Sequence, residues 1–137
     1  MGSGPFLIDT DTLSEIIKGR DLQVAQRASE YLARHGKLRF SIITRYEILR
    51  GLRAKNALRQ VEQFEEVCQA SVVAPLTDEI VARAANIYGV LHQRGALIGD
   101  ADILIAATAL VHGLGLVTEN SAHFERVDGL VIESWRG

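Results

Sequence analysis

The sequence predicts an α/β fold, a three-layer α/β/α sandwich with a mainly parallel central sheet. Short apolar runs that suit buried strands alternate with stretches of helical periodicity along the whole chain. Parallel strands joined by helices require right-handed crossovers, which place helices on both faces of the sheet. No internal repeat or low-complexity linker divides the 137 residues, a length that suits one domain with one core.

The first part of the chain is expected to form two strands and three helices. Residues 6–8 are apolar and precede Asp-Thr-Asp-Thr and then apolar residues at helical spacing. This pattern predicts a strand, a tight turn and a helix that ends near Lys18. A second helix is expected over residues 22–34. A strand over residues 38–42 then leads into a helix that Thr44 would cap.

The rest of the chain is divided by proline, glycine and capping residues. Pro75 ends a strand, and Thr77 begins a long helix with acids in its first turn. Gly95 and Gly99 bracket the next turn, and Gly113 ends the helix that follows. The elements expected after residue 55 are helices over 56–69, 77–94 and 100–112 and strands over 72–74, 116–118 and 131–132.

Composition suits a small cytoplasmic protein. Hydrophobic residues make up 47% of the chain, which favours a packed core over disorder. A single cysteine allows no internal disulfide. The longest apolar run, residues 103–111, is far shorter than a membrane span, and no signal-peptide pattern is present. Met1 to Gly4 are interpreted as a cloning remnant, which leaves residues 5–137 as a single domain.

Asp102 lies at the start of the most apolar helix, and no Asp, Glu, Lys or Arg follows it until Glu119. Because an unpaired buried carboxylate is costly, Asp102 must meet solvent, a helix N-terminus or a bound cation. If Asp100 is the N-cap, Asp102 falls in the first helical turn, where a carboxylate also stabilises free N–H groups. This structural role remains an alternative.

Two other acids have comparable positions. Asp9 follows the first strand, and ligands of open α/β sheets bind beyond the carboxyl ends of strands. Asp11 or Thr12 can cap the next helix, so Asp9 is not needed for that purpose. Glu47 lies three residues after Thr44, which is the spacing of a capping box. Glu47 can also point along the sheet edge, so both roles stay open.

Thr118 and Asn120 end a later strand as Asp9 ends the first. Asn120 can simply hold a turn, which is the commoner use of Asn there. His123 is near enough in sequence to contact a substrate, but a surface or packing role is the favoured interpretation. Cys68 lies on the face of an amphipathic helix, and the histidines lack zinc-site spacing, so no thiol or zinc chemistry is expected.

With these residues the chain resembles the PIN-domain endoribonucleases, and specifically the VapC-type toxins of bacterial toxin–antitoxin pairs. The resemblance runs from Phe6 to Trp135, and its matching segments are residues 7–14, 41–51, 98–107, 116–124 and 129–135. It implies a PIN-like fold and a catalytic set at one sheet edge. By this resemblance Asp9, Glu47 and Asp102 are the metal-site carboxylates, Asn120 holds the fourth catalytic position, and Thr118 supports the site.

The chain departs from the family pattern at three positions. Many members have Asn where this chain has Asp11, and other members have Asp where it has Asn120. The second difference puts in question whether Asn120 binds metal. Asp100 is an additional acid, and residues two apart on a helix point in different directions. We therefore interpret Asp11 and Asp100 as supporting residues rather than ligands.

The resemblance implies an endoribonuclease that depends on Mg²⁺ or Mn²⁺ and acts as a toxin. These hard cations prefer carboxylate and water oxygens, and they can activate water for hydrolysis of an RNA phosphodiester bond. The resemblance also implies a small cognate antitoxin as partner and a homodimer, in which Trp135 could cover an interface or lie in the core.

The net charge of −2 gives no general affinity for nucleic acid, but basic residues gather near Glu47. Arg45, Arg50 and Arg53 are candidates for contacts to RNA phosphates. An ordinary solvated helix face explains them equally well.

Two other functions remain as alternatives. The first is a catalytically inactive PIN fold that only binds RNA or protein, which the intact acids disfavour. The second is a receiver-like phosphoacceptor domain, which also clusters acids at one end of a sheet. Such a domain needs a lysine after a late strand and an Asp at the end of a middle strand. Here Thr118 is followed by Glu-Asn-Ser, and residues 72–75 contain no Asp.

Overall fold

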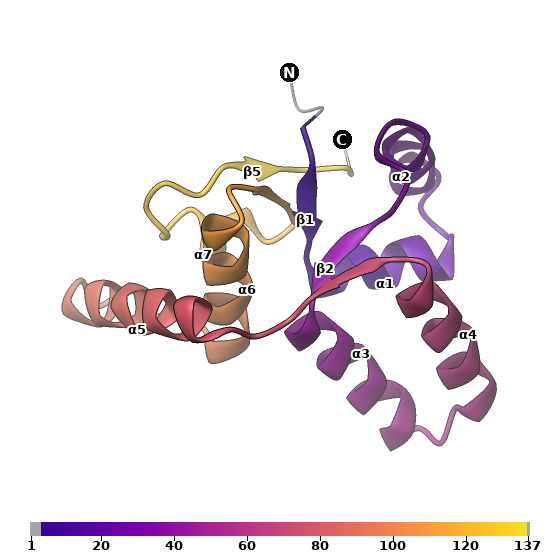
Figure 1. The fold of residues 1–137 in the computed structure, drawn as a ribbon, viewed down its shortest axis with the longest axis horizontal. Helices are drawn as coiled ribbons and strands as arrows, with labels where there is room; N and C mark the ends of the chain where they lie inside the picture. The colour runs from indigo at the N-terminus through magenta and orange to yellow at the C-terminus, as the bar shows by residue number, and fades with distance from the viewer. Residues whose placement is uncertain (1–3, 137) are drawn as a thin grey trace.

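The computed structural model describes residues 4–136, in which strands and helices alternate as predicted (Figure 1). The strands are β1 (Phe6–Ile8), β2 (Arg39–Ser41), β3 (Val72–Ala74), β4 (Gly115–Val117) and β5 (Ile132–Glu133). The helices are α1 (Thr10–Lys18), α2 (Leu22–His35), α3 (Ile42–Ala54), α4 (Leu58–Gln69), α5 (Asp78–Gln93), α6 (Asp100–Val111) and α7 (Ser121–Phe124). The short helix α7 was not predicted. Residues 1–3 of the predicted cloning remnant lie outside the described residues.

The strands are parallel and form two hydrogen-bonded groups. β4 lies between β1 and β5, so that Val117 pairs with Ile8 on one side and with Glu133 on the other. β2 pairs with β3, with Phe40 opposite Val73. β1 and β2 are in contact (Figure 1), but no strand pairing joins them in the described part of the chain. The strands are therefore parallel, as predicted, but the sheet is interrupted between β1 and β2.

The side chains of β1 point alternately into two cores, as the two-residue period of a strand requires. Leu7 packs with α5 and α6, whereas Phe6 and Ile8 pack with α1, α2 and α4. Figure 1 shows these helix groups on opposite sides of β1, which confirms the three-layer arrangement. Trp135 belongs to the second core, where its ring lies 5.7 Å from that of Tyr31. Its place is thus in the core and not at an interface.

The first helix begins at a residue that was not expected to cap it. Asp9 has extended backbone geometry, and its side chain accepts a hydrogen bond from the N–H of Thr12. The prediction that Asp11 or Thr12 caps this helix is therefore wrong. The reason lies in the sheet, because the N–H of Asp9 still bonds to Val117 and α1 starts only after it.

Two later helices also begin earlier or differently than predicted. Ser41 caps α3, with its hydroxyl accepting the N–H of Ile43, so Thr44 lies inside the helix. The capping box of Thr44 and Glu47, one of the two roles left open for Glu47, is thus absent, because the strand ends before Ile42. Gly99, not Asp100, is the N-cap residue of α6, and it offers no side-chain cap.

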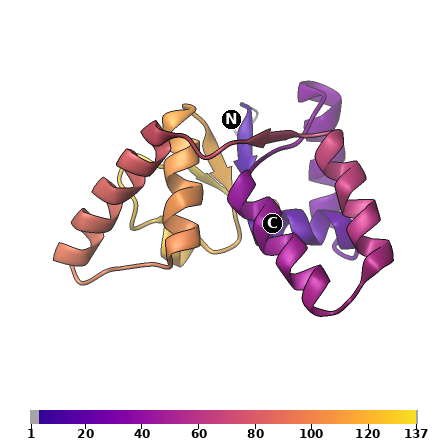
Figure 2. The ribbon, with the colours of Figure 1, turned by 60° about the horizontal axis from the view of Figure 1, so that its bottom comes forward.

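The helices diverge on either side of the central strands. Figure 2 shows α5 and α6 on one side of β1 and α3 and α4 on the other. No helix within residues 4–136 is long and apolar enough to cross a membrane.

Candidate active site

The carboxyl ends of β1 and β4 lie side by side and place predicted site residues at one edge. The N–H of Asp9 donates to the carbonyl of Val117 at 3.0 Å, and the N–H of Thr118 donates to the carbonyl of Glu133 at 3.0 Å. These bonds continue the two parallel ladders by one residue each. Asp9 and Thr118 therefore leave adjacent strands at the same level.

Asp9 is a buried carboxylate, with only 4% of its surface exposed. It accepts a hydrogen bond of 2.9 Å from the N–H of Thr12, and the nearby side chain of Thr118 also stabilises its charged form. Burial raises the pKa of Asp9 above its usual value, and these interactions offset the rise only in part. Within residues 4–136, no Lys, Arg or His forms an ion pair with it. Such a carboxylate is the kind of group that a bound cation stabilises.

Glu47 is held close to this edge by a threonine of α1. The hydroxyl of Thr10 donates to Oε1 of Glu47 at 2.6 Å and lies 3.0 Å from the hydroxyl of Thr44. Thr10 directly follows Asp9 in the chain. The bond therefore ties the second turn of α3 to the first turn of α1, beside the buried carboxylate.

Asp102 joins the site through a histidine. Nδ1 of His123 lies 3.2 Å from Oδ2 of Asp102 and 2.9 Å from Nδ2 of Asn120. The N–H of Asn120 donates to the hydroxyl of Thr118 at 2.9 Å, and the Thr118 side chain lies close enough to Asp9 to lower the pKa of its carboxyl. A continuous series of polar contacts thus connects Asp102 with Asp9 across four segments of the fold.

The donor set fits a hard divalent cation, although the acids do not form a closed cage. In the described range 4–136, no group of three or more Asp, Glu, His or Cys side chains is arranged to hold a metal ion. Mg²⁺ keeps several waters and binds through one or two carboxylates, so a preformed cage is not required. Asp9, Glu47 and Asp102 are the residues that would hold it. The buried, unpaired carboxylate of Asp9 is the observation that supports this fit.

The two supporting acids lie at the periphery, where both are exposed. The charge of Asp11 raises the pKa of Asp9 further. Asp11 also lines a polar groove of about 400 Å³ that reaches Asn120. Asp100 is the first residue of α6 and does not cap it.

The three arginines that are candidates for RNA contacts have different surroundings. Arg45 faces α4, where its terminal nitrogens lie 2.6 and 3.2 Å from the carboxylate oxygens of Glu65. Arg50 lies 3.8 Å from Glu47, and 59% of its side chain is exposed. Arg53 is exposed near the end of α3. Arg45 is thus already paired inside the protein, whereas Arg50 and Arg53 are exposed.

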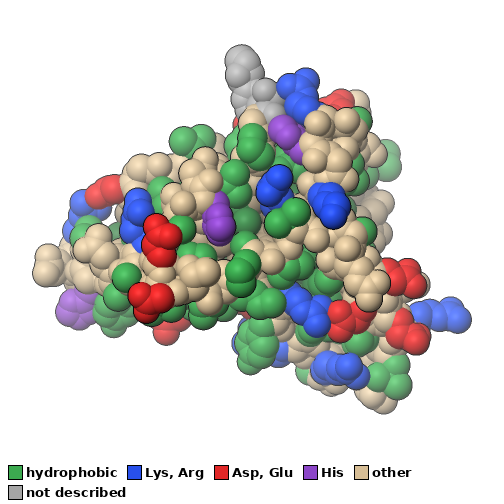
Figure 3. All heavy atoms as spheres, viewed as in Figure 1, with side chains coloured by type: hydrophobic (Ala, Val, Ile, Leu, Met, Phe, Trp, Pro, Cys, Tyr) green, Lys and Arg blue, Asp and Glu red, His purple; other side chains and the backbone are tan. Residues whose placement is uncertain are grey.

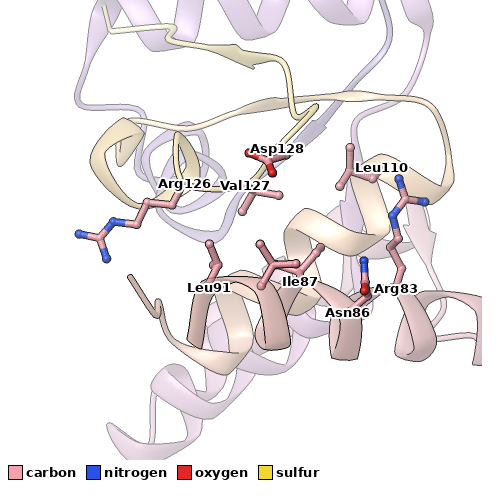
Figure 4. A pocket seen from close by; sticks show the side chains of 9 residues that line it. Arg83, Asn86, Ile87, Leu91, Leu110, Arg126, Val127 and Asp128 are labelled. Atoms are coloured by element: carbon pink, nitrogen blue, oxygen red, sulfur yellow. The ribbon is translucent and has the colours of Figure 1, made fainter. Parts of the chain in front are cut away.

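Surface charge does not mark the site by itself, and one of the pockets lies away from it. On the face shown in Figure 3, Lys and Arg are mixed with Asp and Glu rather than gathered in one basic patch. A pocket of about 200 Å³ lies between α5, α6 and residues 126–128. In it Ile87 and Leu91 face Val127, and no predicted site residue lines it (Figure 4).

The sequence patterns did not identify two residues that contact the site acids, His123 and Thr10. His123 was interpreted as a surface or packing residue, although its proximity to Asn120 was the signal that pointed to the site. Thr10 carries no signal of its own, since it is one of several threonines and aspartates in the turn after the first strand.

A PIN domain family model matches residues 6–130 of the chain. The chain is 33% identical to ribonuclease VapC1 of Methanocaldococcus jannaschii, over 89% of this chain and 80% of that protein. It is 32% identical to ribonuclease VapC2 of Haemophilus influenzae, over 95% of this chain and 97% of that protein. Among solved structures, it resembles a chain of DNA-bound VapBC from Salmonella typhimurium with a TM-score of 0.80 and 29% identity, over 95% and 97% of the two chains.

Proposed function

This chain belongs to the PIN-domain family and is a homologue of the VapC ribonucleases, and from that premise we propose that it is a Mg²⁺- or Mn²⁺-dependent endoribonuclease acting as the toxin of a toxin–antitoxin pair. The substrate class is RNA, and the reaction is hydrolysis of a phosphodiester bond. The proposed catalytic residues are Asp9, Glu47, Asp102 and Asn120.

The observation that supports this proposal is the hydrogen-bonded arrangement at the carboxyl edge of β1 and β4. It links Asp9 to Asp102 through the Thr118 side chain, the backbone N–H and side chain of Asn120, and the His123 imidazole. Asp9 and Asp102 come from segments far apart in the sequence, so this convergence is a property of the fold. A merely structural N-cap role for Asp9 would not require a carboxylate, since Ser, Thr or Asn caps a helix equally well.

The residues of the chain have distinct parts in such a reaction. A divalent cation bound at this edge would supply activation of water and neutralisation of phosphate charge. Thr12 and Thr118 fix the Asp9 carboxylate before substrate arrives, and Thr10 fixes Glu47. Such preorganised groups need little rearrangement during the reaction. Arg50, exposed beside Glu47, can hold a phosphate of the RNA.

The surface beside the helix that carries Glu47 offers a docking place for an antitoxin. An apolar groove of about 190 Å³ lies between α1, α3 and α4; we call it the α1–α3–α4 groove. Ile17, Leu52 and Phe64 contribute to its walls, and Lys18 and Lys55 also line it. We propose that an antitoxin segment lays apolar side chains in this groove and folds on binding. An Arg or Lys of the same partner would pair with a site carboxylate.

The cytoplasm as location and a homodimer as the working form are also part of the proposal. A second copy would cover exposed apolar side chains, such as Val81 and Tyr88 on α5. Measurement of the mass in solution, with and without the antitoxin, tests the oligomeric state.

Cleavage of RNA by the purified chain tests the proposed function. The wild type is expected to cut RNA with Mg²⁺ or Mn²⁺ and not with EDTA, whereas Asp102→Asn loses cleavage and growth arrest while it stays folded. Cys68→Ala is the control that keeps activity. An Asp102→Asn variant with near wild-type cleavage would show that Asp102 only stabilises the helix start. Binding of RNA without cleavage would favour the inactive binding module.

A further inference from the structure

His123 lies on a turn that packing holds in place. His123 belongs to α7, and the residue after it in this helix, Phe124, is buried in the core with α6. The N–H of His123 donates to the carbonyl of Asn120, and the N–H of Asn120 in turn bonds to Thr118 at the end of β4. His123 is therefore held to the sheet edge through Asn120 and Thr118, and to the core through Phe124.

The imidazole is the partner that orients Asp102. Apart from His123, no side chain in residues 4–136 forms a hydrogen bond or ion pair with the Asp102 carboxylate. Asp102 lies in the first turn of an otherwise apolar helix that offers it no cation. Without the imidazole, no hydrogen bond or ion pair among the described residues would fix the rotation of this carboxylate.

Hydrogen-bond chemistry assigns the proton of the ring. An ionised carboxylate only accepts, so Nδ1 of His123 must carry the hydrogen that faces Asp102. Nδ1 cannot then accept from the amide nitrogen of Asn120, and the amide must turn so that its oxygen faces the ring. A bond to a carboxylate is stronger than one to a neutral amide, which favours this arrangement. It requires only the neutral ring protonated at Nδ1.

We propose that His123 is a positioning residue, whose Nδ1–H holds Asp102 in the orientation in which it binds the divalent cation. This inference rests on the proposed function, because it assigns a role within the same site. The other ring nitrogen, Nε2, takes no part in this contact. The side chain of His123 is 43% exposed.

Two amide substitutions separate the two ring nitrogens. His123→Asn places an amide nitrogen near the position of Nδ1, whereas His123→Gln reaches the position of Nε2. Affinity for Mn²⁺ is measured for the wild type, both variants and His123→Ala, by counting free Mn²⁺ with electron paramagnetic resonance. We expect His123→Ala and His123→Gln to weaken Mn²⁺ binding about tenfold, the usual effect of losing an outer partner of a ligand. His123→Asn is expected to bind nearly as the wild type does.

Controls distinguish positioning from general stability. The melting temperatures of the Asn and Gln variants in EDTA should agree, since neither amide changes the packing of Phe124. In an Asp102→Asn background, replacing His123 should cause no further loss of Mn²⁺ affinity, because the carboxylate it orients is gone.

The outcomes also separate this inference from the proposed function. Equal Mn²⁺ affinity in the wild type and all three variants overturns the positioning role alone. Retention by Gln but not by Asn assigns the important contact to Nε2 and overturns it as well. A wild type that binds no Mn²⁺ at all overturns the metal site on which the proposed function depends.

Discussion

The hydroxyl of Thr10 donates a hydrogen bond of 2.6 Å to Oε1 of Glu47, and it thereby fixes an acid of α3 next to the N-cap of α1. Residue 10 has no metal-binding or catalytic chemistry of its own. Its contribution is to position Glu47, and the prediction that follows from it concerns activity more than folding.

Replacement of Thr10 by Val should lower kcat/KM for RNA cleavage by about tenfold. Hydrogen bonds to charged groups contribute about 1.5–3 kcal/mol, and the loss leaves Glu47 free to turn away. Thr10→Ser keeps the hydroxyl and is the matched control, with activity close to that of the wild type. Val and Ser variants of equal activity would show that Glu47 does not depend on this bond.

Asp9→Asn should raise the melting temperature in EDTA at neutral pH and abolish the further rise that Mn²⁺ gives the wild type. Burial raises the pKa of Asp9, so the folded state favours the protonated carboxyl, and ionisation above that pKa costs stability. Asn carries no charge and can still accept the N–H of Thr12. Thermal denaturation with and without Mn²⁺ checks both effects. An equal Mn²⁺-dependent rise in both proteins would exclude a site built on Asp9.

Asp21 should make the fold sensitive to acid. Its carboxylate caps α2, and the hydrogen bond from the N–H of Val24 is the largest cause that lowers its pKa, with Arg136 contributing as well. A lowered carboxyl pKa stabilises the fold above the unfolded pKa of about 3.9, and this stability is lost as pH falls through the folded value. Asp21→Ala should therefore reduce the melting temperature at pH 7 and change it much less at pH 2.

The control for this experiment is Glu62→Ala, a substitution of an exposed acid on α4. Its effect on the melting temperature should be small at both pH values. A loss for Asp21→Ala that is the same at pH 7 and pH 2 would mean that the charge of Asp21 has no part in capping α2.

Removal of the Arg50 side chain should weaken RNA binding, whereas removal of the Arg45 side chain should reduce stability. Arg50→Ala is expected to raise KM and to reduce the salt dependence of RNA binding by about one unit of slope, as for loss of one phosphate contact. Arg45→Ala is expected to lower the melting temperature instead, because it leaves Glu65 without its ion-pair partner. Kinetics at several salt concentrations, together with thermal denaturation, distinguish them. The assignment fails if Arg45→Ala affects KM and Arg50→Ala affects only stability.

An acidic residue in the α1–α3–α4 groove should prevent antitoxin binding and leave RNA cleavage intact. Ile17→Asp places a charge where an apolar side chain of the partner would pack. Leu32→Asp is a matched control on α2, since the Ile17 and Leu32 side chains are equally exposed, at 40%. Co-purification with the product of the neighbouring small reading frame is the measurement. If the partner is still retained by Ile17→Asp, it docks elsewhere.

Local sequence patterns predicted the elements because periodicity, strand length and turn residues depend on near neighbours. The strand before Asp9, the apolar helix after Asp100 and the strand that leads to Thr118 all form close to the expected residues. The positions of Asp9 and Thr118 beyond parallel strands also follow from the sequence, because such strands end at one edge. That acids and polar residues gather there was therefore foreseeable.

Tertiary structure decided which side chains meet. Ser41 rather than Thr44 caps α3, since pairing with β3 ends β2 at that residue. Arg45 turns to Glu65 on α4 because the two helices pack together, which no local pattern around residue 45 reveals.

The contact between Asp102 and His123 is the clearest case of this division. The sequence by itself determined that an acid begins an apolar helix and that a histidine follows the late strand. Only the burial of Phe124 against α6 brings the imidazole to the carboxylate, 21 residues earlier in the chain. Hydrogen bonds within an element follow from local periodicity, whereas a bond between elements forms only after burial of apolar surface has fixed their relative positions.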